Sequence, residues 1–425
     1  MDERERERIR QRKLRKRRVR RIKKMIRAGI ILVFLAIIVS IILFACSDKD
    51  KGNDKDKQEN ETVNQEQSDD EIVIEESYVE PEIDIIMVGD ILLHENVQES
   101  GLLEDGTYNY DHMFANVKDD VQEAEIAIVN QEVILGGKEL GLHGYPSFNG
   151  AFEVGDALVD AGFNVVLHAT NHALDRGKTA LLNCLNFWKT SYPDVGVLGI
   201  FDSQESYDND IYVYEQDGVK IAILNYTYGT NGIAMPDGMP YAVAMLEKDK
   251  VVADIQKANE LADFVIVCPH WGVEYKHEQN SDQEYWANIF LENGVDLVIG
   301  THAHYIQPVE MLTDEAGNQM LVYWSLGNYI NSTSGSGAGT SDRMVGAMAE
   351  ITVSKSEGGE VYIKDYGVEP LVTQLLYGPQ EITTYKLADY TEELAAKNKV
   401  IEKDSAFSLE YCQNLCKEVF GELYE

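Results

Sequence analysis

The chain has 425 residues and a formal net charge of −36 at neutral pH. So strong a negative charge argues against nucleic acid as a partner, because few cations are available to neutralise phosphates. The five cysteines show no paired spacing, so disulfide bonds are not expected to hold the fold together.

The N-terminal region predicts a membrane-directed segment. Residues 1–27 carry fifteen basic and four acidic side chains, a net of +11, which leaves −47 for the rest of the chain. Residues 28–45 are uncharged and apolar, and a helix of that length spans about 27 Å, close to the thickness of a bilayer core. The basic flank predicts a cytoplasmic N-terminus and an extracytoplasmic body. A buried core helix is the alternative, but it fits poorly beside this flank.

The end of the apolar segment leaves two kinds of anchor open. Leu43-Phe44-Ala45-Cys46 resembles the bacterial lipoprotein cleavage box, with Cys46 as the lipidated residue, whereas the long basic region favours a retained single-pass anchor. Both place the protein at the cell membrane. Residues 47–82 have too few large apolar side chains to offset the entropy of ordering, which predicts a disordered acidic linker.

Six short apolar runs then follow, and each ends in a polar cluster. Such runs are typical of strands that are buried on both faces of a sheet. In open α/β sheets, sites form outside the carboxyl ends of the strands, so we expect the six clusters to converge at one sheet edge. The runs are Ile83–Val88, Ile126–Val129, Asn164–Leu167, Phe264–Cys268, Val295–Gly300 and Leu321–Trp324.

Amphipathic stretches between these runs predict helices on the outside of a mixed α/β sheet. The expected helices are Phe152–Ala161, Lys178–Thr190, Lys248–Ala262 and Ser281–Asn293, the last with a capping box at Ser281–Glu284. Antiparallel pairs are expected at Ile211–Tyr214 with Val219–Tyr226, and at Gly346–Val353 with Glu360–Val368. The domain prediction is a tail at 1–27, an anchor or signal at 28–46, a linker at 47–82, a folded domain at 83–385 and closing helices at 386–425.

The polar clusters offer carboxylate, amide and imidazole groups that suit a metal site. If the backbone stays extended past Gly300, the imidazoles of His302 and His304 point to the same side and reach one ion. This donor set favours Mn, Fe or Zn over a cysteine–zinc site or a calcium loop, with one ion or two bridged by Glu132. The candidate ligands are Asp90, Glu132, Asn171, His270, His302 and His304.

Each candidate ligand also has a simpler interpretation. Asp90 could cap a following helix, and Asn171 could cap a helix that starts near Ala173. Glu132 could be a surface carboxylate, and His270 taken alone is more often a buried histidine with satisfied hydrogen bonds. The six positions together favour the metal site.

Further candidates lie beside the expected ligands. Asp175 follows His172 by three residues, a spacing that lets the carboxylate orient the imidazole as a general acid, although Asp175 could merely complement a helix N-terminus. His168 is expected in the core. The predicted substrate-binding residues are His94, Glu274, Tyr275, Asn328 and Arg343.

The motifs together resemble one known family over roughly residues 83–330. The motifs are Val88-Gly89-Asp90, Asn130-Gln131-Glu132, Tyr145–Phe148, Asn171–Gly177, His270–Tyr275, Gly300–His304 and Ser325–Asn328. In this order they resemble the CapA-type poly-γ-glutamate capsule biosynthesis proteins, within the metallophosphatase (calcineurin-like) superfamily.

That resemblance implies a four-layer α/β/β/α sandwich, the six metal ligands named above and His172 as the catalytic histidine. Two positions differ from the superfamily pattern. Leu92 stands where Asp-x-His would place a histidine, and Asn130-Gln131-Glu132 stands in place of Gly-Asp-x-x-Asp. One of two metal positions is therefore expected to lack a ligand.

The sequence thus predicts a membrane-tethered extracytoplasmic protein with a metal-dependent hydrolase-type site. Its expected partners are the cell membrane, an anionic surface polymer such as poly-γ-glutamate and a membrane synthase complex. Two alternatives remain open. One is a surface metallophosphoesterase that acts on nucleotides or phosphorylated polymers, and the other is a non-enzymatic scaffold of a polymer synthase complex.

Overall fold

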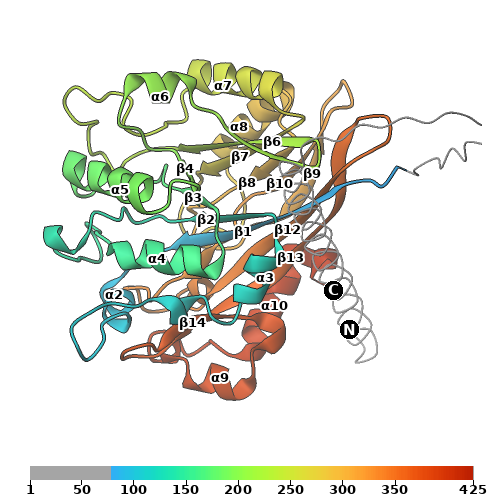
Figure 1. The fold of residues 1–425 in the computed structure, drawn as a ribbon. Coiled ribbons are helices and arrows are strands. Elements are labelled where there is room, and N and C mark those ends of the chain that lie inside the picture. Colours follow the sequence, from blue (N-terminus) through green and yellow to red (C-terminus); the bar gives the residue numbers. More distant parts are fainter. Residues whose placement is uncertain (1–77, 425) are drawn as a thin grey trace, which may run out of the picture. The chain divides into compact units, whose positions relative to one another are not determined.

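A computed structural model describes residues 78–424, which contain two mixed β-sheets with helices around them (Figure 1). Residues Val79–Glu425 form one compact unit. The predicted tail, the predicted anchor and most of the predicted linker lie outside the described residues. Among the helices between residues 78 and 424, none combines the length and the apolar character needed to cross a bilayer.

The first sheet has a parallel half and an antiparallel half that meet at β1. β1 pairs in parallel with β2 on one side and antiparallel with β12 on the other. The short strand β11 (Asn328–Ile330) also pairs in parallel with β1. The path of the sheet is β14 (Ile382–Lys386), β13 (Val361–Leu375), β12 (Val345–Lys355), β1 (Glu82–Ile91), β2 (Ile126–Asn130), β3 (Val165–Leu167) and β4 (Gly196–Leu198).

The second sheet has four parallel strands with an antiparallel strand at each edge. The expected hairpin is present, and its turn at Asp217-Gly218 has φ of 52° and 76°, as a type I′ turn requires. The order of the sheet is β5 (Tyr212–Gln216), β6 (Val219–Thr227), β7 (Phe264–His270), β8 (Leu297–Ile299), β10 (Gln319–Tyr323) and β9 (Val309–Thr313).

The six strands that carry the polar clusters are divided between the two sheets, so the prediction of one shared sheet edge is wrong. β1, β2 and β3 belong to the first sheet, and β7, β8 and β10 belong to the second. Hydrophobic periodicity identifies buried strands but says nothing about which strands are neighbours. The Tyr323 hydroxyl on β10 donates a hydrogen bond to the Gly367 carbonyl on β13 at 2.9 Å, which ties the two sheets together. One hydrophobic core extends over both sheets.

The longer helices lie where the sequence predicts them. α7 packs on β6 and β7, α8 packs on α7 and β10, and α10 packs on β13. Figure 1 shows α7 at the top, above β6 of the second sheet, and α4 below β1 and β2 of the first sheet. The helices are α2 (Glu95–Ser100), α3 (Lys118–Glu123), α4 (Phe152–Ala161), α5 (Gly177–Ser191), α6 (Gln204–Asn209), α7 (Lys248–Leu261), α8 (Ser281–Glu292), α9 (Glu392–Lys397) and α10 (Leu409–Phe420).

The capping box of α8 is shifted by one residue from its predicted position. The N-cap is Asn280, whose side chain accepts from the Gln283 backbone at 2.8 Å, while Gln283 accepts from the Asn280 backbone at 3.1 Å. Gln283 is buried and also donates to the Gln307 side chain at 2.9 Å. This tertiary contact favours Gln283 over Glu284 as the third residue of the helix.

A partly buried carboxyl group makes the stability of the second sheet depend on pH. Asp296 immediately precedes β8 and accepts a hydrogen bond from the Val265 backbone at 2.8 Å. Burial raises the pKa of Asp296 from 3.8 to about 6. Because the folded state binds this proton more tightly than the unfolded state, the contribution of Asp296 to stability falls as the pH rises from about 4 to 6.

We therefore expect Asp296→Asn to raise the free energy of unfolding by about 2 kcal/mol at pH 8. Asparagine keeps an acceptor for the Val265 N–H but carries no charge to bury. The gain should disappear below about pH 4, where both states of the wild-type carboxyl group are protonated. Urea unfolding of both proteins across this pH range measures the difference, and a pH-independent difference would contradict the prediction.

Candidate metal centre

Asp90 connects segments of both sheets. It is fully buried near the carboxyl end of β1. The neighbouring Gly89 lies so close to Gly327 that a Cβ atom at position 89 would be 1.9 Å from the Gly327 carbonyl oxygen. The Asp90 carboxylate accepts from Asn130 Nδ2 at 2.7 Å and from the His302 backbone N–H at 3.2 Å. His304 Nδ1 lies 3.0 Å from the same carboxylate.

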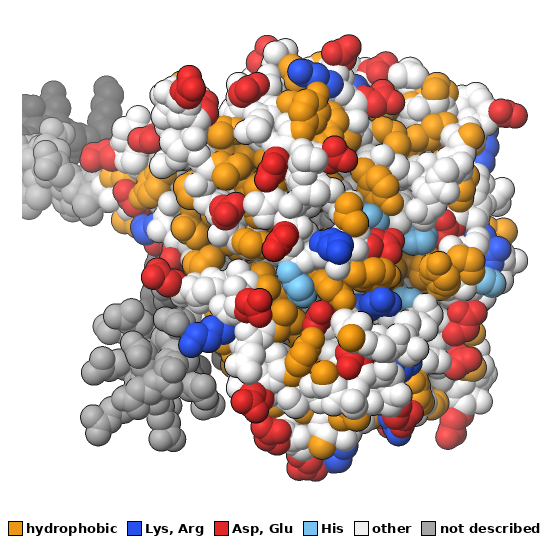
Figure 2. Space-filling view, turned by 180° about the vertical axis from the view of Figure 1, so that it is seen from behind, with side chains coloured by type: hydrophobic (Ala, Val, Ile, Leu, Met, Phe, Trp, Pro, Cys, Tyr) orange, Lys and Arg blue, Asp and Glu red, His pale blue; other side chains and the backbone are white. Residues whose placement is uncertain are grey.

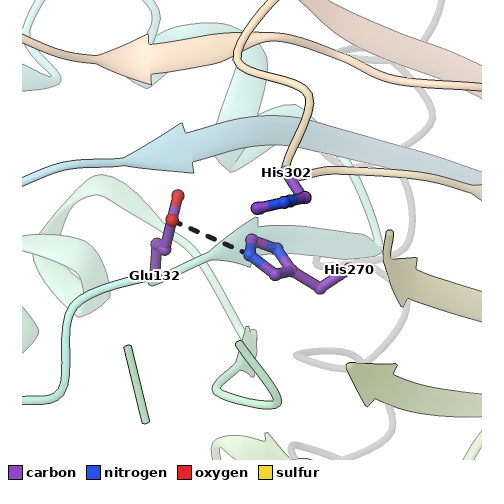
Figure 3. A group of neighbouring side chains, drawn as sticks. All are labelled: Glu132, His270 and His302. Carbon is purple, nitrogen blue, oxygen red and sulfur yellow. Dashed lines mark ion pairs between the residues drawn. The ribbon is translucent and has the colours of Figure 1, made fainter. Parts of the chain in front are cut away.

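Glu132, which follows β2, places a buried carboxylate at the centre of the cluster. Figure 3 shows Glu132, His270 and His302 converging from three segments of the chain. Oε1 of Glu132 lies 3.7 Å from Nε2 of His270, 3.8 Å from Nε2 of His304 and 3.9 Å from Nε2 of His172. These separations are too long for hydrogen bonds, and neither carboxylate oxygen has a partner among the described residues. A buried carboxylate without hydrogen bonds is costly, so this position favours a bound cation.

The ring of His270, at the carboxyl end of β7, is held by polar neighbours on both of its nitrogen atoms. Nδ1 lies 3.0 Å from the Thr301 hydroxyl and 3.4 Å from Asn130 Nδ2. Nε2 lies 2.9 Å from Oδ1 of Asn171. Such partners fix the orientation of a histidine that binds a metal.

His302 and His304 reach the cluster through a bent backbone, so the expected extended conformation is wrong. Their φ angles are 92° and 56°, which lie in the left-handed region that residues other than glycine seldom adopt. The two ring centroids are nevertheless 5.7 Å apart. The Tyr228 ring lies 4.5 Å from the His302 ring and limits its movement. Backbone strain of this kind is common at functional sites.

The electrostatics of the four residues differ according to their surroundings. Burial raises the pKa of Glu132 well above its usual value and lowers the pKa of His270 and His302 well below theirs. Burial also disfavours charge on His304, but the Glu132 and Asp90 carboxylates outweigh it and raise the pKa of His304 to about 9. Two neutral imidazoles beside a carboxylate form a suitable donor set for a divalent ion.

His172 and Asp175 form the contact that their spacing predicts. Nδ1 of His172 lies 2.7 Å from Oδ2 of Asp175, although the segment between them is a turn and not a helix. Asp175 also accepts a hydrogen bond from the Phe148 backbone at 2.7 Å. The Phe148 ring meets the His172 ring edge-on at 4.7 Å. These contacts leave Nε2 of His172 directed toward Glu132.

The capping alternatives do not fit the structure. Asp90 lies within β1, and α2 begins only at Glu95. α5 begins at Gly177, so Asn171 does not cap it. His168 belongs to the core, as predicted, and its Nε2 accepts a hydrogen bond from the Trp188 indole at 3.0 Å.

The predicted substrate-binding residues lie at different depths around the cluster. Glu274 is exposed, yet its carboxylate lies within 4.8 Å of donor atoms on His302 and His304. The ring of His94 packs edge-on against Phe148 at 5.4 Å. Burial, and after it the charge of His304, lowers the pKa of His94 to about 3.

Three further predicted residues form one side of the site. The Arg343 guanidinium lies 3.8 Å from the centre of the Tyr275 ring. Asn328 is buried, with Oδ1 at 3.0 Å from Nδ1 of His304 and Nδ2 donating to the Arg343 carbonyl at 3.0 Å. In this position Asn328 orients His304.

The sequence prediction missed several residues that hold the cluster together. Asn130 and Thr301 come directly after two of the predicted strands, so their place in the sequence could have identified them as site residues. Tyr228 and Asn231 follow the carboxyl end of β6, which the sequence presented only as one arm of a hairpin. Nδ2 of Asn231 lies 3.4 Å from Nδ1 of His172, and its Oδ1 accepts from Asn171 at 3.3 Å.

The donor atoms form three overlapping groups, and within each group all atoms lie within 4.8 Å of one another. The Glu132 carboxylate and Nδ1 of His302 receive no hydrogen bond from the described residues, so these buried donor atoms remain available for an ion. The residues therefore fit a divalent metal. The groups are Glu132 with His270 and His302, Glu274 with His302 and His304, and Asp90 with Glu132 and His304.

The fold and site define a mixed α/β protein with a buried carboxylate–imidazole centre suited to a divalent metal. More specifically, the chain belongs to the bacterial capsule synthesis protein family PGA_cap, whose model matches residues 84–333. The resemblance found in the motifs is thus confirmed.

Two relatives carry names from the same family. The chain is 27% identical to the capsule biosynthesis protein CapA of Bacillus anthracis over 57% of its own length and 58% of that protein. It is 29% identical to the PGA biosynthesis protein CapA of Bacillus subtilis (strain 168) over 41% of its own length and 44% of that protein. The match covers less than two thirds of either relative.

Similarities to solved structures are distant. The NAD nucleotidase NadN of Haemophilus influenzae aligns with a TM-score of 0.44 and 14% identity, covering 81% of this chain and 64% of that chain. A 5′-nucleotidase precursor from Thermus thermophilus aligns with a TM-score of 0.41 and 15% identity, covering 71% of this chain and 56% of that chain.

The Glu132 carboxylate, which has no hydrogen bond from the described residues, provides a test of the metal centre. We expect Glu132→Gln to unfold at the same or a higher temperature than the wild type in the presence of a chelator, because a buried charge is removed. Saturating Mn²⁺ or Zn²⁺ should stabilise the wild type by about 2–3 kcal/mol and the variant much less. Thermal unfolding with and without metal measures both effects, and equal stabilisation of the two proteins would contradict the assignment.

Proposed function

We propose that this protein acts in the synthesis of a poly-γ-glutamate capsule or a related anionic surface polymer, through a metal-dependent hydrolase-type site. The observation that carries the proposal is the buried Glu132 carboxylate, which faces three imidazole nitrogens without a hydrogen bond from the described residues. The family membership and the names of the two Bacillus relatives support the class of polymer.

The proposal includes the location and the finer architecture. The predicted anchor at residues 28–46 would tether the folded domain to the outer face of the membrane, where a capsule polymer is assembled. The two sheets with helices on their outer sides would correspond to the four-layer metallophosphatase-like sandwich.

Six residues would hold one or two Mn, Fe or Zn ions. A bound divalent ion lowers the pKa of coordinated water and stabilises negative charge on a reacting oxygen. Glu274 would extend the donor set at the exposed side of the cluster. The six are Asp90, Glu132, Asn171, His270, His302 and His304.

His172 is suited to move a proton at the edge of this cluster. Asp175 holds the Nδ1 side of the ring, so a proton transfer to or from substrate would take place at Nε2. The Phe148 ring packs against the same imidazole and excludes water from one side. This arrangement suits protonation of a leaving group, either an amine from a γ-amide or an alkoxide from a phosphoester.

We first expect the purified full chain to contain close to stoichiometric Mn, Fe or Zn by elemental analysis. The double variant His302→Ala/His304→Ala should lose the metal because two imidazole ligands are removed. His112→Ala serves as a matched control, because His112 lies 3.0 Å from the Ser100 hydroxyl and belongs to none of the three donor groups. Absence of metal from the wild type after reconstitution would contradict the catalytic proposal and favour a scaffold.

We next expect His172→Ala to retain its metal but to cleave γ-glutamyl polymer at a rate lowered by roughly 10²–10⁴-fold. Asp175→Asn should give a smaller loss, because the ring remains but its orientation is less well fixed. Asp160→Asn, which changes an exposed aspartate paired with Lys118, should leave the rate unchanged.

Substrate comparison separates the hydrolase alternatives. Release of phosphate from nucleotides or phosphorylated polymers that depends on His172, without cleavage of γ-glutamyl polymer, would overturn the proposed substrate and favour a surface phosphoesterase.

A further inference from the structure

Two cations lie side by side at the edge of the metal centre, on segments that follow the family match. Arg343 belongs to a 3-10 helix, Asp342–Met344, and Lys403 follows another, Lys399–Glu402. The positive charge of Arg343 contributes to a lowered pKa of Lys403, after the larger effect of burial. The matched region ends at residue 333, so neither side chain belongs to it.

Both cations are held by neutral oxygen atoms of the same loop. Nη1 of Arg343 donates to the Thr333 hydroxyl at 2.8 Å. Nζ of Lys403 donates to the carbonyl of Ser332 at 3.0 Å and also to that of Thr333. These contacts position the two cations together without neutralising them.

Neither cation has a carboxylate partner between residues 78 and 424. Asp342 is engaged with His277 at 3.3 Å and with the Tyr411 hydroxyl. Asp404 accepts from the backbone of Ser341 at 3.1 Å. Nε of Arg343 is buried and has no hydrogen-bond partner among these residues. In a chain with a net charge of −36, two adjacent unpaired cations provide a local site for an anion.

This pair adjoins the metal centre. Arg343 stacks on the Tyr275 ring, whose centre lies 5.9 Å from that of the His304 ring. Lys403 is placed beside Arg343 because both side chains donate to Thr333. In Figure 2, Lys or Arg side chains lie beside histidine side chains on the visible face.

We infer that Arg343 and Lys403 form a second anion subsite, which binds a carboxylate or phosphate of a substrate while another anionic group of the same substrate occupies the metal centre. The inference rests on the proposed function, because it assumes that the metal centre binds an anionic substrate. A γ-linked glutamate chain carries one carboxylate on each residue and therefore meets the requirement for repeated anions. A single anion such as inorganic phosphate would use the metal centre alone.

The test measures binding to the full chain by calorimetry with three probes: a γ-linked glutamate tetramer, a glycerol phosphate tetramer and inorganic phosphate. We expect Lys403→Gln and Arg343→Gln each to weaken tetramer binding by about tenfold, with phosphate binding unchanged. Lys399→Gln is the matched control, since it removes the same charge from the neighbouring helix, where Lys399 pairs with Glu402 at 2.6 Å. Lys403→Arg should preserve binding because it keeps the charge.

Each outcome bears on the subsite or on the proposed polymer. If Lys403→Gln and Lys399→Gln bind the tetramers equally, the subsite is wrong while the proposed function stands. If only the glycerol phosphate tetramer depends on Lys403, the subsite is supported and the proposed glutamate polymer is overturned. Loss of binding in Lys403→Arg as large as in Lys403→Gln would assign Lys403 a purely structural role. Tetramers that bind the wild type no more tightly than phosphate would also refute the subsite.

Discussion

The structure of the site depends on one buried carboxylate. Glu132 lies in a position where neither oxygen receives a hydrogen bond from the described residues, and three imidazole nitrogens stand 3.7–3.9 Å away. A group of this kind destabilises the folded protein unless a positive charge compensates it. The surrounding strands must therefore be stable enough to hold the carboxylate in place, and both sheets contribute long buried strands for that purpose.

The two sheets meet through the polar side chains around this carboxylate. Asp90, on the first sheet, receives the backbone N–H of His302 from the second. Asn130, also on the first sheet, lies against His270 at the end of β7. The imidazoles of His270 and His304 thus have orienting hydrogen-bond partners on other segments, and the Tyr228 ring packs against that of His302. A change in one partner is expected to disturb several donors at once, because they share the same contacts.

The sequence predicted the strands and the longer helices well, since short buried runs and amphipathic stretches have distinct periodicities. It also selected side chains that the structure brings together, because each lies at or beyond the carboxyl end of a strand, while their role as metal ligands stays a prediction. It failed where long-range contacts decide the outcome. The division into two sheets, the left-handed backbone at His302 and His304, and the N-cap at Asn280 all depend on neighbours that are distant in sequence. Tyr228 and Asn231 were missed because a parallel strand was interpreted only as part of a hairpin.

Charge limits how this acidic protein could engage the acidic polymer that we propose as its partner. The chain carries −36, so most of its surface repels a polyanion, and such repulsion falls off over about 8 Å at physiological ionic strength. Attraction would then be confined to a small region, where a metal-loaded centre and the Arg343–Lys403 pair would together supply positive charge. Repulsion elsewhere would keep a long polymer from adhering along the surface and would leave only a short segment of it in contact. All six candidate metal ligands lie inside the family match, whereas Arg343 and Lys403 lie beyond its end, so the proposed chemistry and the proposed selection of a polymer would fall to different parts of the chain.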